Sequence, residues 1–174
     1  MQYKKLGEYI RQTGKKNIDL ALKKPKGINM NKKFIQSVAN IVGTDMSKYR
    51  VVQKNQFAYN PMHVGRDHLV PIAVHLNEED IIVSPAYVVF EICRPQELLP
   101  EYLMFWFKES NFDRRAWFTT DNSVRGGFSW DSLCEMVIPI PTPQQQALLC
   151  LKHLFETEGT FLYRKELLNR SLKG

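Results

Sequence analysis

The sequence predicts an α+β protein in which one mixed globule, residues 1–141, is followed by one long C-terminal helix, residues 142–174. Three observations support this prediction. Runs rich in β-branched and aromatic residues fill much of the segment 27–92, which is typical of strands. Helix-like patterns begin at Pro100, and a leucine-rich tail follows Pro141. With 174 residues, 44% of them hydrophobic, the chain is large and apolar enough to form a domain with its own core.

The positive charge is concentrated at the N-terminus. Residues 1–33 hold ten Lys and Arg against Glu8 and Asp19, a net charge of +8, while the rest holds 14 basic and 16 acidic side chains, or −2, giving +6 in total. Such a segment is either a solvated surface or an electrostatic footprint for a polyanion, most often a nucleic acid. In the second case we expect non-specific attraction to a phosphate backbone from Lys15, Lys16, Lys32 and Lys33.

Strand patterns dominate the first half of the globule. The stretch "GINMNKKFIQSVANIVGTDMSKYRVV" is interpreted as a strand, a loop and a second strand, punctuated by Gly27 and Gly43 as turn or loop residues. In "QFAYNPM", Phe57 and Tyr59 share one strand face, and the strand ends at an Asn-Pro turn. "LVPIAVHL" and "DIIVSPAYVVFEI" predict further strands, and Pro71 and Pro85 predict edges or bends within them.

Helical patterns follow from Pro100, which suits the first turn of a helix over "PEYLMFWFKES". Its expected buried face comprises Leu103, Phe105, Trp106 and Phe107. "NFDRRAWF" predicts a second short helix, and Ser129 is a good N-cap for a third, "WDSLCEM". The apolar strand "MVIPIP" then closes the globule.

A rigid joint connects the globule to the terminal helix. Thr142, Pro143 and Gln145 combine an N-cap, a proline at the first helical position and a glutamine at the third, which is a capping box. A helix from here to about Leu172 would be on the order of 45 Å long. Steps of four and three place a coiled-coil seam along it, formed by Ala147, Leu151, Leu154, Glu158, Phe161, Lys165, Leu168 and Leu172. One helix cannot bury such a stripe alone, so the seam needs a partner surface.

Motifs for bond-making chemistry are incomplete. The stretch beginning Asn60-Pro61 lacks the second proline and the aromatic residue of base amino-methyltransferases, and no glycine-rich turn for S-adenosylmethionine accompanies it. Asp80 and Glu91 match the paired carboxylates of metal-dependent nucleases, but Cys93 occupies the position where that motif has a lysine. We therefore expect no catalytic residue.

Metal and cofactor motifs are also incomplete. His63, His68 and His75 lack a fourth ligand at a suitable spacing, so a polar loop with exposed histidines is the expectation. Gly126-Gly127 is not followed by the Lys-Ser/Thr of a phosphate-binding loop. We expect no metal and no cofactor.

The compartment follows from what the chain lacks. Cys93, Cys134 and Cys150 are odd in number and far apart, which predicts no disulfide framework. The first residues lack the apolar core of a signal peptide, and no apolar run approaches the roughly 18–20 residues that span a bilayer. A cytoplasmic protein with no membrane partner is the expectation.

Polar loops on a packed body are the remaining functional signal. Arginine and asparagine can each make paired hydrogen bonds to base edges, and serine, histidine and glycine amides suit phosphates. The loops "YNPMHVGRDH", "NFDRRAWF" and "TDNSVRGG" carry these residue types. As candidate DNA-contacting residues we take Lys54, Asn60, His63, Arg66, Arg114, Asn122, Ser123 and Arg125. Arg114 and Arg115 could equally cap a helix or pair with Glu109 or Asp113.

The whole pattern resembles the specificity subunit of type I restriction–modification systems, as one target recognition domain with the start of its spacer helix. The resemblance covers nearly the full chain, through "KLGEYI", "FIQSVANIVGTDMSKYRVVQKNQFAYN", "HVGRDHLVPIAV", "IIVSPAYVVFEI", "LLPEYLMFWFKESNFDRRAWF" and "SVRGGFSWDSLCEMVIPIPTPQQQ". The segment "IPIPTPQQQ" is the most diagnostic, since a similar sequence ends each recognition domain of that family. Gln145 is a departure, because a glutamate is usual there.

This resemblance implies a protein that does no chemistry itself. It would dock a DNA methyltransferase (modification) subunit and a restriction/translocase subunit, and select the double-stranded DNA on which they act. Each recognition domain would read one half of a bipartite target, and the spacer helix would set the distance between halves.

One departure leaves alternatives open. A full specificity subunit carries two recognition domains and two spacer helices, whereas this chain has one of each, as expected of a natural half-subunit, a truncation product or a fragment. Two copies of a natural half could form a homodimer through Leu151, Leu154, Phe161, Leu168 and Leu172. Two further readings are an interaction or decoy protein of the same complex that does not read DNA, and the detached recognition domain of a fused restriction–methylation enzyme.

Overall fold

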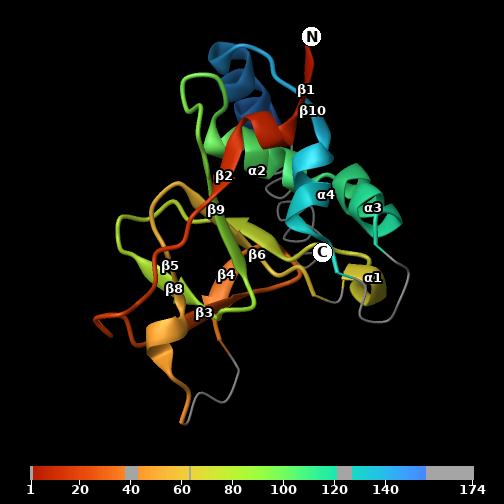
Figure 1. Cartoon of the computed structure of the whole chain (residues 1–174). Helices are drawn as coiled ribbons and strands as arrows, with labels where there is room; N and C mark the ends of the chain where they lie inside the picture. The colour runs from red at the N-terminus through yellow and green to blue at the C-terminus, as the bar shows by residue number, and fades with distance from the viewer. Residues whose placement is uncertain (1, 38–42, 63, 121–126, 156–174) are drawn as a thin grey trace, which may run out of the picture.

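Two four-stranded sheets, a two-stranded ribbon and a set of helices form the body (Figure 1). The computed structural model describes residues 2–37, 43–62, 64–120 and 127–155. The predicted α+β class is confirmed. None of the helices in the described ranges is both long enough and apolar enough to span a bilayer.

The first sheet has the strand order β2-β9-β6-β7 and is antiparallel throughout. Its strands are β2 (Ile10–Gln12), β6 (Gln56–Tyr59), β7 (Ile72–Val74) and β9 (Val88–Ile92). The second sheet, of order β4-β3-β8-β5, contains β3 (Pro25–Ile28), β4 (Phe34–Gln36), β5 (Arg50–Val52) and β8 (Ile81–Val83), and its β3–β8 pair is parallel. The ribbon pairs β1 (Tyr3–Lys5) with β10 (Val137–Pro139).

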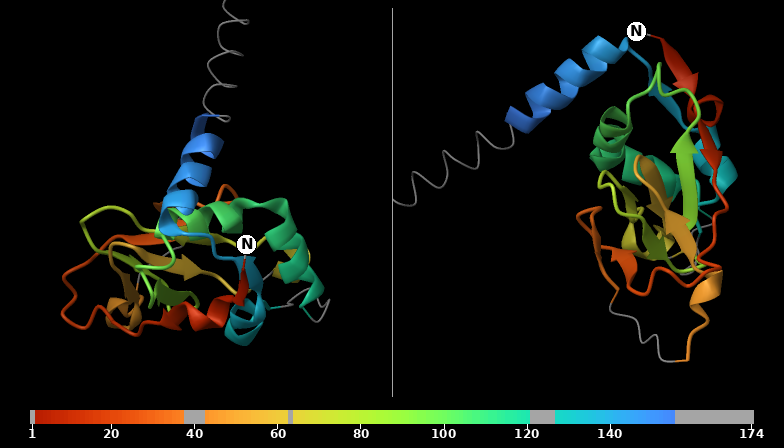
Figure 2. Two further views of the ribbon diagram at one scale, coloured as in Figure 1. Left: turned by 90° about the horizontal axis from the view of Figure 1, so that it is seen from above. Right: turned by 90° about the vertical axis from the view of Figure 1, so that its left-hand side faces the viewer.

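The helices are η1 (Leu6–Glu8), η2 (Met46–Lys48), α1 (Val64–Asp67), α2 (Pro100–Lys108), α3 (Ser110–Phe118) and α4 (Trp130–Glu135). Residues 143–155 are also helical. Figure 2 shows this last segment leaving the body near the end where β1 and β10 pair.

Alternation along β6 produces two cores. Phe57 and Tyr59 lie on one face, as predicted, and pack in the main core with the helices, where the Phe57 and Phe90 rings stack at 5.0 Å. Ala58 lies on the other face, in a smaller core between the sheets. That smaller core is completed by Val52, Val83 and Val89. Because side chains alternate along a strand, the centre of the first sheet is covered on both faces.

The segment after Gly27 contains one more strand than predicted. Gly27 is not at a turn but inside β3, where a Cβ would lie 3.8 Å from the Tyr87 hydroxyl. The chain then turns back as β4, which pairs antiparallel with β3, before β5 begins. The two prolines behave as expected: Pro71 precedes the edge strand β7, and Pro85 lies in the turn between β8 and β9.

Helix α2 begins at Pro100 as predicted, but it buries a different set of side chains. The buried residues are Tyr102, Leu103, Met104 and Phe107, whereas Phe105 and Trp106 are half-buried. Tyr102 can be buried without loss because its hydroxyl is hydrogen-bonded. The hydroxyl donates to the Pro139 carbonyl at 3.0 Å and accepts from Trp106 Nε1 at 3.2 Å. A tyrosine or tryptophan in a core needs such a partner for its polar atom.

Lys32 corrects one prediction directly. It is buried rather than exposed, with the left-handed backbone angle φ of 55°. Its Nζ lies 2.7 and 2.8 Å from the two carboxylate oxygens of Asp113, and it also donates to the Phe107 carbonyl. Asp113 in turn accepts from the Val70 amide at 3.0 Å. This pair therefore joins the β3–β4 turn, the end of α2, helix α3 and the chain that enters β7.

The ammonium of Lys32 depends on its partner. Burial lowers the pKa of Lys32 below its ordinary 10.5, and the hydrogen bonds and charge of Asp113 oppose that shift. A buried ion pair adds little net stability over an apolar pair, but removing one member leaves an uncompensated charge in a poorly solvated place.

We predict that Asp113→Asn destabilises the fold by about 3–5 kcal/mol near neutral pH. Without the carboxylate the Lys32 pKa falls further, so the folded chain releases this proton before the unfolded chain does. The folded state is then penalised below that lowered pKa, and the penalty shrinks as pH rises toward 10.5. Urea unfolding near neutral pH and at about pH 10 measures both effects.

The exposed Asp131 on α4 provides the control, since Asp131→Asn should change stability by less than about 0.5 kcal/mol. Wild-type stability in Asp113→Asn, or a penalty that does not change with pH, would contradict this account of Lys32.

Candidate nucleic-acid interface

One edge of the body brings together the turn after β6, helix α1 and helix α3. Helix α1 packs against α3 (Figure 1), and the Phe128 amide donates to the Pro61 carbonyl at 2.9 Å. A Cβ on Gly127 would lie 3.5 Å from the same carbonyl. Segments that are distant in the sequence, such as Pro61 and Phe128, thus meet at this edge.

Asn60 lies at this edge and shapes the turn. Its Oδ1 accepts a hydrogen bond from the Met62 backbone amide at 3.0 Å, and the Asn60 backbone amide donates to the Pro71 carbonyl at 3.1 Å. This is the local hydrogen bonding that makes asparagine favourable in turns. The carbonyl side of the Asn60 side chain is therefore already used within the protein.

Arg114 is exposed on α3 at the same edge. Its Nη2 donates to Asn111 Oδ1 at 2.7 Å. Pairing with Asp113 is excluded as its main contact, because Asp113 holds Lys32. Arg115 instead donates to the Val137 carbonyl at 3.3 Å, on the side of α3 that faces α4.

A hollow of about 420 Å³ opens between α1 and α3. It is lined by His68, Ser110, Asp113, Arg114 and Trp117. The exposed His68 imidazole stacks on the Trp117 indole, with the ring centroids 4.6 Å apart and the planes 18° apart. His68 has φ of 52°, a conformation that costs energy for a residue other than glycine and is found preferentially at functional positions.

Sequence reasoning missed part of this hollow. Trp117 and Ser110 were outside the predicted set, and His68 was noted only as a member of its loop. The available signal was the spacing of Trp117, three residues after Arg114, which puts both on one face of a helix. No local signal pairs Trp117 with His68, because they lie on different elements.

Several predicted residues fall beyond the reach of the structure. His63, Asn122, Ser123 and Arg125 lie outside the described residues, and Arg66 belongs to α1 without a described side chain. Their described neighbours Thr120 and Gly127 flank the edge, the first just after α3 and the second against Pro61. Their roles stay predictions.

Lys54 does not join this group. It precedes β6, whereas Asn60 follows it, and the four residues of that strand alone span roughly 13 Å. The Lys54 ammonium forms an ion pair with Glu78 in the loop after β7.

The exposed lysines expected to attract phosphate lie at the second sheet, with Lys15 and Lys16 beside β5 and Lys33 just before β4. Lys15 pairs with Asp80 at 3.2 Å, and Lys16 and Lys33 are exposed. His75, expected to be exposed, is buried, and its Nε2 lies 2.6 Å from the Glu79 carbonyl oxygen. It is a structural residue of the β7–β8 loop.

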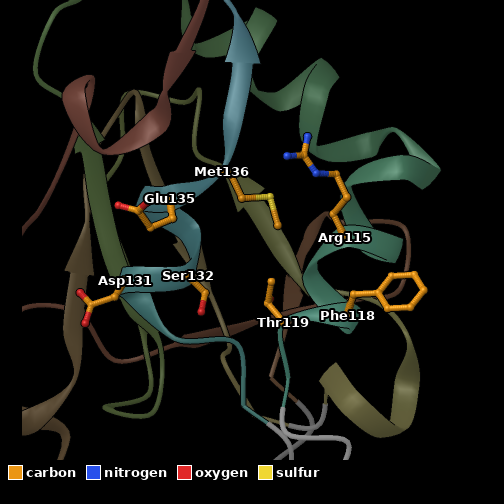
Figure 3. Close-up of a pocket in the computed structure, with 7 residues that line it drawn as sticks. All are labelled: Arg115, Phe118, Thr119, Asp131, Ser132, Glu135 and Met136. Atoms are coloured by element: carbon orange, nitrogen blue, oxygen red, sulfur yellow. The ribbon is translucent and has the colours of Figure 1, made fainter.

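A larger hollow of about 500 Å³ lies between α3 and α4 (Figure 3). Arg115, Phe118 and Thr119 line one side, and Asp131 and Glu135 belong to the other. The two carboxylates point away from the arginine, so the polar groups do not converge as they do around a reacting atom (Figure 3). Among the described residues, no three His, Cys, Asp or Glu side chains are grouped to hold a metal ion.

The predicted capping box at the joint is present. The Thr142 amide donates to Gln145 Oε1 at 3.1 Å, and the Gln145 amide donates to Thr142 Oγ1 at 3.4 Å. In the helix that follows, the seam residues Ala147, Leu151 and Leu154 are all exposed. The body packs against Gln146, Leu149, Cys150 and His153, and Leu151 and Leu154 line a hollow of about 380 Å³ beside β7 and α2. Phe161, Leu168 and Leu172 lie outside the described residues.

We predict that Trp117→Ala loosens α1. An aromatic pair contributes about 0.5–1.5 kcal/mol, so the His68 amide, bonded to the Val64 carbonyl at 2.9 Å, should exchange with solvent roughly two- to tenfold faster. Trp117→Phe keeps a ring and should retain most of the protection. The Cys93 amide, which donates to the Tyr9 carbonyl just beyond the paired ends of β2 and β9, is the internal control. Equal exchange of His68 in all three proteins would show that the stack does not hold α1.

Comparison with known proteins yields no matching family model and no matching curated protein. Among solved structures, the fold is similar to the crystal structure of a type I restriction–modification system S subunit from M. genitalium. The TM-score is 0.54 at 14% sequence identity, and the match covers 98% of this chain and 42% of that one. The chain therefore spans less than half the length of that S subunit, and its described fold is similar to a segment of it.

Proposed function

We propose that this protein is a non-catalytic DNA recognition module of a type I restriction–modification complex. The observation that carries the proposal is the structural similarity of nearly the whole chain to an S subunit. The sequence motifs independently resemble the same family. In this role the protein binds double-stranded DNA and directs a methyltransferase subunit and a restriction subunit to one half of a bipartite target.

The α1–α3 edge is the proposed DNA contact. Arg114 supplies a guanidinium that suits either guanine or phosphate, and His68 and Ser110 supply donors beside it in the same hollow. Stacking on Trp117 holds the imidazole in place, which reduces the entropy lost on binding. Arg66, His63, Asn122, Ser123 and Arg125 are proposed to extend this contact, and Asn60 to shape it.

The exposed lysines over the second sheet act differently in this proposal. Lys15, Lys16 and Lys33 attract the phosphate backbone over a longer range and carry no sequence information. Lys54, already paired with Glu78, contributes in the same non-specific way.

The C-terminal helix is proposed as a separate functional part, residues 142–174, beyond a recognition domain of residues 1–141. Two of its described seam residues, Leu151 and Leu154, are 52% and 48% exposed, and they line a hollow of about 380 Å³ that β7 and α2 also border. An amphipathic helix with a half-exposed apolar stripe gains stability when a partner surface buries the rest of it. We propose that a second copy covers it, with Phe161, Leu168 and Leu172 continuing the seam.

Arg114→Ala tests the DNA contact, with the neighbouring Arg115→Ala as a matched control on the other side of α3. If Arg114 reads a guanine, binding of target DNA by the complex with its methyltransferase weakens by about 1–3 kcal/mol. If it contacts a phosphate, affinity falls equally for all sequences and the slope of log affinity against log salt falls by about 1. Fluorescence anisotropy over a salt series distinguishes these cases.

Wild-type affinity in Arg114→Ala, with a loss only in Arg115→Ala, would contradict the placement of the interface. An assembled complex whose DNA affinity is indifferent to both changes and to salt would instead support the decoy interpretation.

Leu151→Glu and Leu154→Glu test the seam. Each puts a charge into an apolar contact, so self-association should weaken by a factor of ten or more, on the scale of about 1.4 kcal/mol or above. Sedimentation velocity over a concentration series measures it. Lys152→Glu, exposed on the same helix but off the seam, should leave association unchanged. A wild-type protein that stays monomeric at high concentration would rule out the homodimer.

A further inference from the structure

The three consecutive glutamines at the joint, Gln144, Gln145 and Gln146, differ sharply in environment. Gln144 and Gln145 are exposed, whereas Gln146 is 0% exposed. A fully buried glutamine must satisfy two donors and an acceptor inside the protein, or it costs stability.

Gln146 satisfies all of them with backbone groups of other segments. Its Nε2 donates to the Glu97 carbonyl at 2.6 Å and to the Pro141 carbonyl at 2.8 Å. Its Oε1 accepts from the Leu99 amide at 2.9 Å. The Gln146 side chain, on the first turn of the helix, thus bonds both the segment that follows β10, at Pro141, and the connection that leads into α2, at Glu97 and Leu99.

A second contact lies two turns further along the same helix face. The His153 ring meets the Phe105 ring of α2 edge to face at 5.0 Å. Residues 146 and 153 are about 10 Å apart along the axis. Leu149 and Cys150 pack against the main core between them. Two anchored points on one face define a direction, whereas the capping box bonds only within its own turn and defines only where the helix begins.

We propose that Gln146 is the positioning residue that sets the direction in which the C-terminal helix leaves the body. The consequence for DNA rests on the proposed function: if the helix pairs with a second copy, its direction sets the separation of the two α1–α3 edges. Directional control at Gln146 itself needs no DNA and can be measured on the free protein.

The test measures a distance between a body probe and a helix probe. Cys93 is exposed and serves as the body site, and Phe155→Cys, 73% exposed, provides the helix site. Cys134→Ala and Cys150→Ala remove the other thiols from every protein compared. Spin labels at the two sites then report the distribution of distances by pulsed electron paramagnetic resonance.

Gln146→Met keeps the length of the side chain and removes its hydrogen bonds, so the distance distribution should widen or shift. Gln144→Met makes the same change at an exposed neighbour and should leave the distribution as it is. In parallel, the Leu99 amide should exchange about tenfold faster or more in Gln146→Met, the scale of one lost hydrogen bond. An unchanged distribution in Gln146→Met overturns the proposal.

Two further measurements cover a variant that fails to fold. Gln146→Asn keeps the amide but is too short to reach all three partners, and the same widening is expected. In the protein without substitutions at Gln146, the Leu99 amide should exchange as slowly as the Cys93 amide, and rapid exchange there overturns the proposal by itself. Because no DNA is present, a failure of DNA binding would count against the proposed function and not against this inference.

Discussion

The buried ion pair between Lys32 and Asp113 is the contact on which the arrangement of the body depends. It joins two residues that are 81 positions apart and ties the turn of the second sheet to α3. Through the Val70 amide, the same carboxylate holds the chain that follows α1. Both walls of the α1–α3 hollow are therefore held in place by the same buried carboxylate, Asp113. An apolar pair of the same volume could stabilise the fold as well, but it would not hold three segments by directional bonds.

At the other end of the body, where the C-terminal helix begins, a buried polar side chain again joins several segments, but this side chain is uncharged. Gln146 also uses one polar side chain to hold several backbone segments, and there the result is the direction of a helix. Between these two ends lies the aromatic core around Phe57, Phe90 and Phe107. Close-packed interiors resist deformation, so a contact at one end and a helix at the other are held at a constant distance. Such a body is suited to measuring spacing, which is the task proposed for it.

Much of the fold could be predicted because its signals are local. Pro100 at a first turn, Ser129 as an N-cap and the Thr142–Gln145 capping box depend on residues a few positions apart, and all are present. Lys32 was misread because a lysine among lysines predicts a solvated surface, and its carboxylate partner is distant in the sequence. Trp117 was missed for a similar reason, since its partner His68 lies on another helix. The special role of Gln146 is likewise set by partners nearly fifty residues away, which local patterns cannot indicate.

In the proposed function, this chain chooses the DNA sequence on which a partner enzyme acts. The most direct measurement is a genome-wide map of methylated bases in cells that express the neighbouring methyltransferase with and without this chain. We expect a bipartite, interrupted methylation motif that appears only when the chain is present. If two copies act together, the two halves of that motif are symmetric. An identical methylation pattern with and without the chain, when the chain is shown to associate with the methyltransferase in the cells that express both, would rule out the proposed function.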